Sequence, residues 1–133
     1  MSTISLKGAS VSTIGEIPKA GKKAKDFSLV KTDLSKSILA DYAGTKLVLN
    51  IFPSVDTGTC AKSMREFNRI ASNLPNTKVV CISRDLPFAF KRFCAAEGLE
   101  NVIVSPILQL DLSVKITDLK LRVAVYQIYT HVL

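Results

Sequence analysis

The apolar residues of the chain are densest over residues 47–74, where two periodicities follow one another. Residues 47–52 form an almost unbroken apolar run, which is typical of a strand buried on both faces. The segment Pro53–Thr59 supplies turn residues, and beyond it apolar residues recur every three or four positions. This second period predicts a helix with one buried face. The residues of that face are Cys60, Met64, Phe67, Ala71 and Leu74.

Shorter strands are predicted on both sides of this stretch. Thr3–Leu6 and Ser10–Ile14 flank Lys7 and Gly8 and alternate polar with apolar residues, which predicts a hairpin at the N-terminus. A connector rich in Pro, Gly and Lys follows the hairpin. Further strands are expected at 27–30, 77–83 and 101–105, with an edge element at 33–39 and a turn at 41–44.

A second helix is predicted directly after the strand at 77–83. Asp85 is expected to be its N-cap and Pro87 to lie in its first turn, while Gly98 ends it. The first helix lies between two apolar strands in the sequence, so these two strands are expected to be parallel. The alternation of strands and helices predicts a three-layer α/β domain with a mixed central sheet and flanking helices. One face of the second helix carries Phe90, Phe93, Cys94 and Glu97.

The chain has 133 residues, of which 47% are hydrophobic, so we expect one domain over residues 1–133 with a core of moderate size. It contains no apolar run of about 18 residues, and its first residues lack the charged and apolar regions of a secretory signal. No membrane segment and no secretion are therefore indicated, and the cytoplasm is the expected location. Three cysteines do not make a disulfide framework.

The charge balance is basic, with 18 Lys and Arg against 11 Asp and Glu and a net charge of +7. Such a balance can indicate a nucleic acid or an anionic surface as partner. The densest basic cluster, Lys19–Lys25, contains no aromatic residue on which a base could stack. A solvated basic loop is the simpler interpretation, so no nucleic-acid partner is expected. The rival function, binding of a nucleic acid or an acidic surface, would be revealed by binding that depends on salt concentration.

Cys60 lies where the first helix would begin, and this position affects its chemistry. The first turn of a helix presents N–H groups without carbonyl partners and the positive end of the helix dipole. Both favour a thiolate, which is the nucleophilic form of cysteine. Thr57 precedes Cys60 closely enough for its hydroxyl to reach the sulfur or an oxygen bound there, and Pro53 can shield the loop because it has no N–H. Placement alone leaves open that Cys60 is a small buried hydrophobic residue.

The other candidates for polar chemistry give weaker signals. Cys81 lies between two apolar residues of a predicted strand, where a cysteine is most often inert core. Cys94 shares a helix face with two phenylalanines, and by pattern alone it is also core rather than catalytic. A zinc site would need Cys60, Cys81, Cys94 and His131, but the sequence has no CxxC or HxxxH pair. Neither a metal nor an organic cofactor is predicted.

Two segments resemble the thiol peroxidase branch of the peroxiredoxins. Pro53-x-x-x-Thr57-x-x-Cys60 matches the motif of the reactive cysteine of peroxiredoxins, and residues 50–60 as a whole are similar to this branch. Residues 80–98 are also similar to it, including the resolving cysteine at Cys94. The resemblance runs from about residue 2 to residue 104. It implies a thioredoxin-like fold with an N-terminal β-hairpin.

The resemblance also implies an activity, that of a thiol-dependent peroxidase acting on hydrogen peroxide and organic hydroperoxides. The Cys60 thiolate would attack the terminal oxygen of the hydroperoxide and become a sulfenic acid. Cys94 would then form an intramolecular disulfide with Cys60, and a thioredoxin-type dithiol would restore both thiols. In the family an arginine stabilises the thiolate and the peroxide, and Arg122 is the position that resembles it. A homodimer is implied as well.

The last quarter of the chain does not follow the family pattern. Residues 114–118 and 121–126 resemble parts of the expected sequence brought closer together, so Arg122 is nearer to Cys94 than the pattern has it. We therefore expect a domain that is incomplete after about residue 105, through truncation, alteration or an error in the sequence. This leaves a rival function open, namely a redox switch or interaction protein that keeps the Cys60–Cys94 pair but lacks turnover.

Overall fold

A four-stranded mixed sheet forms the centre of the structure, a computed structural model that describes residues 3–6, 8–12, 19–24, 26–107 and 127–132. β5, β6 and β7 are parallel to one another, whereas β8 runs antiparallel to β5. The mixed sheet expected from the sequence is therefore confirmed. The strands follow one another across the sheet in the order β7 (Ile103–Pro106), β6 (Thr77–Ser83), β5 (Lys46–Ile51) and β8 (Gln127–Val132).

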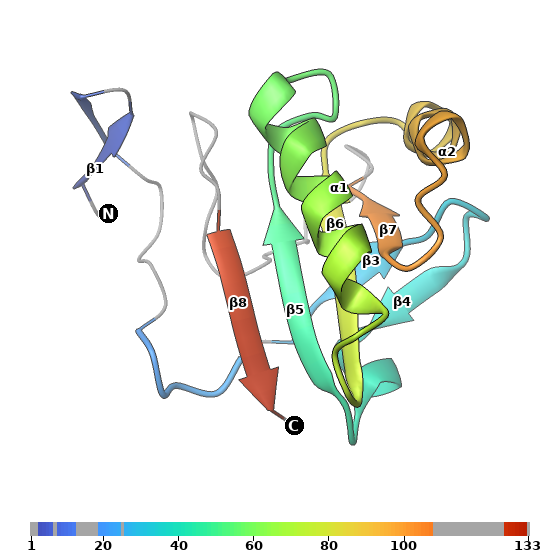
Figure 1. The fold of residues 1–133 in the computed structure, drawn as a ribbon. Coiled ribbons are helices and arrows are strands. Elements are labelled where there is room, and N and C mark those ends of the chain that lie inside the picture. Colours follow the sequence, from blue (N-terminus) through green and yellow to red (C-terminus); the bar gives the residue numbers. More distant parts are fainter. Residues whose placement is uncertain (1–2, 7, 13–18, 25, 108–126, 133) are drawn as a thin grey trace.

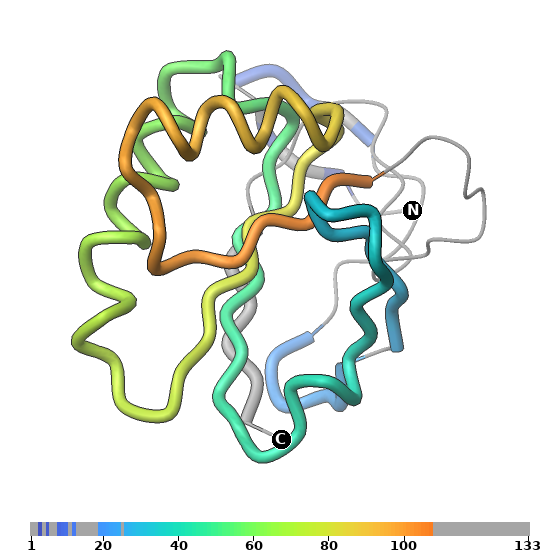
Figure 2. Tube along the Cα trace, turned by 90° about the vertical axis from the view of Figure 1, so that its right-hand side faces the viewer, coloured from blue at the N-terminus to red at the C-terminus, as the bar shows by residue number. Residues whose placement is uncertain are grey.

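Two helices lie against one face of this sheet and a small hairpin lies against the other. α1 (Gly58–Ala71) and α2 (Pro87–Glu97) are on the same side, as Figures 1 and 2 show. Figure 2 views the sheet nearly edge-on and shows the hairpin on the opposite side. The described residues thus form the three layers that the sequence predicted. The hairpin layer consists of β3 (Ser28–Val30), β4 (Lys36–Ile38) and the 3₁₀ helix η1 (Leu39–Tyr42).

Alternate residues of the central strands enter two separate cores. Val48, Val79 and Cys81 lie in the core under the helices, where Phe90 is fully buried. Each fully buried large side chain of this kind contributes roughly 1.5–3 kcal/mol to folding. Because the strands are covered on both faces, their sequences are mainly apolar runs instead of an alternation. The core under the hairpin contains Phe27, Leu29, Leu39, Tyr42, Leu47, Leu49, Val80 and Ile82.

α1 begins slightly earlier than predicted, within the segment Pro53–Thr59 that was expected to be a turn. Thr57 is its N-cap residue and has an extended backbone, with φ −93° and ψ 137°. The Ala61 N–H donates to the Thr57 carbonyl at 3.0 Å. The helix therefore begins at Gly58, inside the predicted turn segment, and Cys60 lies in its first turn as expected.

The buried face of α1 matches the prediction except at its end. Cys60 and Met64 are fully buried, and Phe67 and Ala71 pack against the same core. The expectation that Leu74 continues this face is wrong, because the helix ends at Ala71 and Leu74 is 37% exposed. A proline follows Leu74 in the sequence, and the residue before a proline is disfavoured in the helical conformation.

The ends of α2 confirm one predicted signal and correct another. Gly98 ends the helix in the left-handed conformation, with φ 66°, as predicted. Pro87 is the first helical residue, also as predicted. The expectation that Asp85 is the N-cap is wrong: Leu86 has that position, and no side chain caps the helix. The Asp85 carboxylate instead accepts hydrogen bonds from Ser54 and Val55, in the loop that leads to Cys60.

The N-terminal hairpin is present as predicted. β1 (Thr3–Leu6) pairs antiparallel with β2 (Ala9–Ser12), and Gly8 turns the chain with φ 86°. The strand β8 was not predicted, although its sequence is rich in β-branched and aromatic residues. Its six residues pair with all of β5 and so cover that edge of the sheet. Residues 114–118 and 121–126, with Arg122, lie outside the described residues.

Candidate active site

Cys60 lies where the chain leaves the sheet and enters α1. It is in the first turn of the helix, and none of its surface is exposed (0%). A helix start favours an anionic side chain, whereas burial removes the water that would solvate one. The chemistry of Cys60 therefore depends on the loop that places it. Its core neighbours include Val48, Phe52, Val55, Met64 and Phe90.

The loop before α1 is folded around Ser54. The Ser54 carbonyl accepts hydrogen bonds from the Thr57 N–H at 3.3 Å and from the Thr57 hydroxyl at 3.1 Å. The Ser54 hydroxyl accepts the Asp56 N–H at 3.1 Å. Pro53 is half-buried, and its carbonyl accepts the Arg84 N–H at 3.4 Å. Because the Thr57 hydroxyl proton is directed at the loop backbone here, its role towards the sulfur or a bound oxygen stays a prediction.

Cys94 lies on α2 and packs against the core cluster that contains Cys60. Neither cysteine is in a disulfide bond, and Cys94 is half-buried. Arg65 of α1 binds Glu97 of α2 through Nε–Oε2 at 2.7 Å and Nη2–Oε1 at 3.0 Å. This pair holds the pKa of the Glu97 carboxyl below its usual range. The Arg65 guanidinium also lies 6.0 Å from the centre of the Phe93 ring. The helices that carry the two cysteines are thus joined directly.

The surroundings of Cys81 and Cys94 oppose ionisation of their thiols. Burial raises the pKa of Cys81 to about 12 and the pKa of Cys94 to about 11. Cys81 has no exposed surface and accepts a hydrogen bond from the Asn50 Nδ2 at 3.7 Å. The Asn50 Oδ1 accepts the Ser63 hydroxyl at 3.1 Å. This environment supports the interpretation of Cys81 as inert core.

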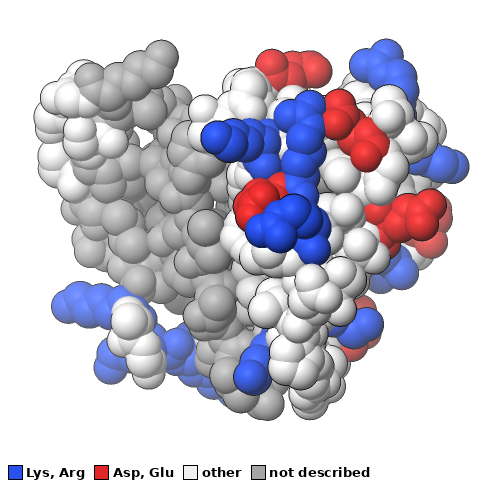
Figure 3. All heavy atoms as spheres, viewed as in Figure 1, with Lys and Arg blue, Asp and Glu red and all other residues white. Residues whose placement is uncertain are grey.

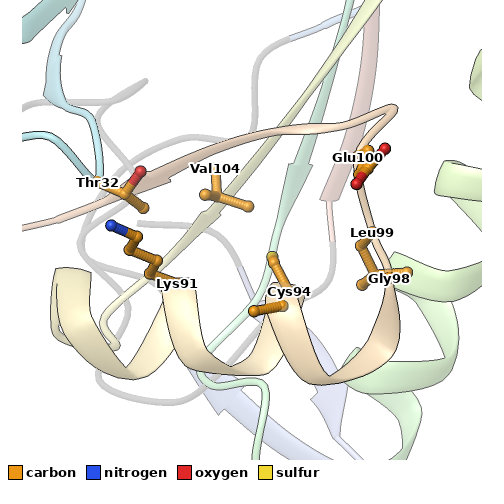
Figure 4. A pocket seen from close by; sticks show the side chains of 8 residues that line it. Thr32, Lys91, Cys94, Gly98, Leu99, Glu100 and Val104 are labelled. Carbon is orange, nitrogen blue, oxygen red and sulfur yellow. The ribbon is translucent and has the colours of Figure 1, made fainter.

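A pocket of about 240 Å³ opens beside Cys94 (Figure 4). α2 contributes Lys91 and Cys94, β7 contributes Val104, and the turn between β3 and β4 contributes Thr32. In Figure 4 the Lys91 side chain extends towards Thr32. Cys60 is not among the lining residues. Cys94 therefore borders a surface recess, whereas Cys60 is enclosed in the core.

The outer face of α1 carries charges of both signs. Figure 3 shows Lys and Arg side chains over this helix with acidic side chains between them. Glu66 and Arg69 form an ion pair there. The basic residues are interspersed with acidic ones, so this face is not a continuous basic stripe of the kind that follows a nucleic-acid backbone. The exposed charged residues of α1 are Lys62, Arg65, Glu66 and Arg69.

The described part of the chain offers neither a metal-binding cluster nor a membrane-spanning helix. Among the described residues, no group of three or more His, Cys, Asp and Glu side chains could hold a metal ion. His131, which the zinc hypothesis would need, has no described side chain. In the same part of the chain, no helix is long and apolar enough to cross a membrane.

Sequence reasoning missed three polar residues around the site, namely Ser54, Asp85 and Asn50. Ser54 and Asp85 are joined by a hydrogen bond of 2.7 Å across 31 residues of sequence, so no local pattern could pair them. Asn50 did carry a signal, since it is a lone amide in an otherwise apolar strand and is only 2% exposed. A buried amide of this kind needs hydrogen-bond partners.

The fold and the site together define a thioredoxin-like domain of the peroxiredoxin type. The chain belongs to the Redoxin family, whose sequence model matches residues 19–119. A thiol peroxidase from Corynebacterium glutamicum is 54% identical over 102 residues, which are 77% of this chain and 62% of that protein. The resemblance to thiol peroxidases and the thioredoxin-like fold are therefore confirmed.

Solved structures agree with this assignment. A peroxiredoxin-like protein from Aquifex aeolicus has a TM-score of 0.73 and 34% identity, over 80% of this chain and 63% of that one. A thiol peroxidase from Chromobacterium violaceum has a TM-score of 0.71 over 82% of this chain and 64% of that one, and at 23% identity it supports the fold alone. The chain thus spans between 62% and 64% of the length of these three relatives.

Proposed function

We propose that this chain reduces hydrogen peroxide and organic hydroperoxides at Cys60, as a thiol-dependent peroxidase. The placement of Cys60 carries the proposal: it lies in the first turn of α1, directly after the Pro53–Thr57 loop, and in one core cluster with Cys94. The 54% identity to a thiol peroxidase supports the same function. The chemistry needs sulfur alone, so neither a metal nor an organic cofactor is part of the proposal.

In the first step the Cys60 thiolate attacks the terminal oxygen of the hydroperoxide. The O–O bond breaks, the sulfur becomes a sulfenic acid, and the remaining oxygen leaves as water or an alcohol after protonation. Thr57 is proposed to orient the hydroperoxide through its hydroxyl, and Pro53 to shield the loop from solvent. Arg122 is proposed to stabilise the thiolate and the leaving oxygen, because a guanidinium keeps its charge and donates to two atoms at once.

In the second step the Cys94 sulfur attacks the sulfenic acid, which gives a Cys60–Cys94 disulfide and water. A disulfide needs Cα atoms within roughly 4.4–6.8 Å and Cβ atoms that face each other. Packed helices lie about 8–10 Å apart between their axes. Because the two thiols lie on different helices, we propose that at least one of the two segments unwinds locally before the bond forms.

Restoration of the thiols requires a dithiol partner. A thioredoxin-type protein would attack the disulfide, pass through a mixed disulfide and leave both cysteines reduced. Such a partner operates in a reducing compartment, so the cytoplasm is the proposed location. A homodimer is part of the proposal, as the resemblance to thiol peroxidases implies.

A steady-state assay with thioredoxin, its reductase and NADPH tests the proposal. The parent chain should consume hydrogen peroxide and an organic hydroperoxide over many turnovers. Cys60→Ser should abolish consumption, whereas Cys81→Ser, which changes a cysteine of the same core cluster, should leave it nearly intact. Equal damage by both substitutions in folded variants would show that the roles are assigned wrongly. One oxidation without turnover would favour the rival redox switch.

A further inference from the structure

Asp85 joins the segment before Cys60 to the segment before Cys94. It is half-buried and lies between the end of β6 and the start of α2. Its Oδ1 accepts the Ser54 hydroxyl at 2.7 Å, and its Oδ2 accepts the Val55 N–H at 2.9 Å. Both donors belong to the loop between β5 and α1, 31 and 30 residues away in the sequence. One carboxylate thus ties together two segments that are distant in the chain.

Ser83, at the end of β6, also binds the Asp85 carboxylate. The Ser83 hydroxyl donates to Asp85 Oδ2 at 2.6 Å and accepts the Asp85 N–H at 3.1 Å. Ser83 is only 1% exposed, so this support belongs to the buried end of β6. Hydrogen bonds to an ionised acceptor are roughly twice as strong as neutral ones. The Asp85 carboxylate is therefore held in place and anchors the loop between β5 and α1.

Ser54 transmits this restraint to the start of α1. Its hydroxyl is held by Asp85, and its carbonyl receives both the N–H and the hydroxyl of Thr57. Thr57 is the N-cap residue of the helix whose first turn contains Cys60. Val55, the other donor to Asp85, is 5% exposed and lies in the same core cluster as Cys60. Loss of the carboxylate would thus free the loop at two adjacent residues.

We propose, on the basis of the peroxidase function proposed above, that Asp85 is a positioning residue with two opposite effects. It accelerates the reaction of Cys60 with peroxide, because it fixes the loop that presents Thr57 and the first turn of α1. It slows formation of the Cys60–Cys94 disulfide, because its bonds hold together the segments that must move. Asp85 thereby sets how long the sulfenic acid persists.

Two reactions compete for that sulfenic acid. In the first, the Cys94 sulfur attacks the Cys60 sulfur, an S–S bond forms, and the hydroxyl group leaves with the Cys94 proton as water. In the second, another hydroperoxide transfers one oxygen to the Cys60 sulfur, which becomes a sulfinic acid, and the hydroperoxide leaves as water or an alcohol. The first reaction requires the loop or α2 to move, whereas the second does not. Removal of the restraint should therefore favour the disulfide over the sulfinic acid.

Rapid mixing of the reduced full chain with hydrogen peroxide, followed by acid quench and intact mass, separates the steps. The thiol, the sulfenic acid, the disulfide and the sulfinic acid differ in mass. In Asp85→Ala, oxidation of Cys60 should slow about tenfold, the change in rate that loss of a hydrogen bond to a charged group can produce. Disulfide formation should become about threefold faster or more, and less sulfinic acid should accumulate at high peroxide.

Three further variants make the test specific. Ser54→Ala removes one donor to the carboxylate, together with the acceptor of the Asp56 N–H, and should change both rates in the same directions by smaller factors. It decides the question if Asp85→Ala does not fold. In the Asp85→Ala background, Ser54→Ala should have a smaller effect than in the parent, since part of its effect depends on the carboxylate. Asp33→Ala is the matched control, because Asp33 likewise accepts a serine N–H at 2.9 Å and a serine hydroxyl at 2.5 Å, but in the turn between β3 and β4.

The outcomes separate this inference from the proposed function. Opposite changes in the two rates, with Asp33→Ala behaving as the parent, support the positioning role. Rates unchanged within about twofold, or both rates slowed together, overturn it. A parent chain whose Cys60 does not react with peroxide would instead refute the peroxidase function itself.

Discussion

Raising the pH above about 9 should destabilise the folded chain, because the buried Cys81 thiol resists ionisation. Burial raises the pKa of Cys81 to about 12, from an ordinary value of 9.0. Below about pH 9 the folded and unfolded states both hold this proton, so Cys81 contributes no pH dependence. Above about pH 9 the unfolded thiol ionises while the folded thiol stays protonated. The unfolded state then binds fewer protons, and the free energy of unfolding must fall as the pH rises.

The size of this effect follows from the same pKa difference. Each pH unit between the unfolded and folded pKa values lowers the free energy of unfolding by about 1.4 kcal/mol. From about pH 8 to about pH 10.5 Cys81 should therefore remove about 2 kcal/mol. This is a large share of the roughly 5–15 kcal/mol by which domains are usually stable. Cys94 adds to the loss in the same direction, by less, because it is half-buried and partly solvated.

Urea unfolding at the two pH values, followed by circular dichroism under reducing conditions, measures this loss. Cys81→Ala provides the comparison, and at pH 8 it should cost roughly 1–2 kcal/mol for the small cavity and the lost Asn50 partner. The variant should then lose about 2 kcal/mol less than the parent when the pH is raised. An equal loss in parent and variant would show that the Cys81 thiol ionises as easily in the folded state as in the unfolded one.

Three substitutions test the proposed catalytic roles. Cys94→Ser should leave the first oxidation of Cys60 in place but prevent the intramolecular disulfide, so sulfinic acid should accumulate at high peroxide; an unchanged disulfide yield by intact mass would exclude Cys94 as the resolving cysteine. Thr57→Val should slow the reaction with peroxide about fivefold, as loss of one hydrogen bond would, and equal rates in stopped-flow mixing would remove its role. Arg122→Met should slow the same step about a hundredfold, whereas an unchanged rate would make Arg122 a solvated arginine.

The sequence predicted the parts of this fold that rest on local signals. The strand–helix–strand unit from β5 to β6 was visible because a buried run and a helical period follow one another along the chain. Gly98 was visible as a helix end because only glycine adopts the left-handed conformation without strain. Cys60 could be placed in the first turn of α1 because a turn signal precedes it and a helical period follows it, although the helix begins slightly earlier, at Gly58.

What the sequence left unseen depends on contacts between distant residues. Asp85 has the residue type and position of an N-cap, but a serine hydroxyl and an N–H from another loop bind its carboxylate instead. The strand β8 is defined by its pairing with β5, some eighty residues earlier, and strand propensity depends strongly on such partners. At Asp85 tertiary contacts override the local preference, whereas at β8 they supply the partner strand for a segment that already favours a strand.

The disulfide formed after one equivalent of hydrogen peroxide tests the account most directly. The reduced chain should be oxidised with that amount, alkylated, digested and mapped by mass spectrometry. We expect a Cys60–Cys94 bond within a single chain, accompanied by a loss of helical circular dichroism as one of the two segments unwinds. A bond that joins Cys60 to Cys81, or one that links two chains, would contradict the mechanism proposed for this domain.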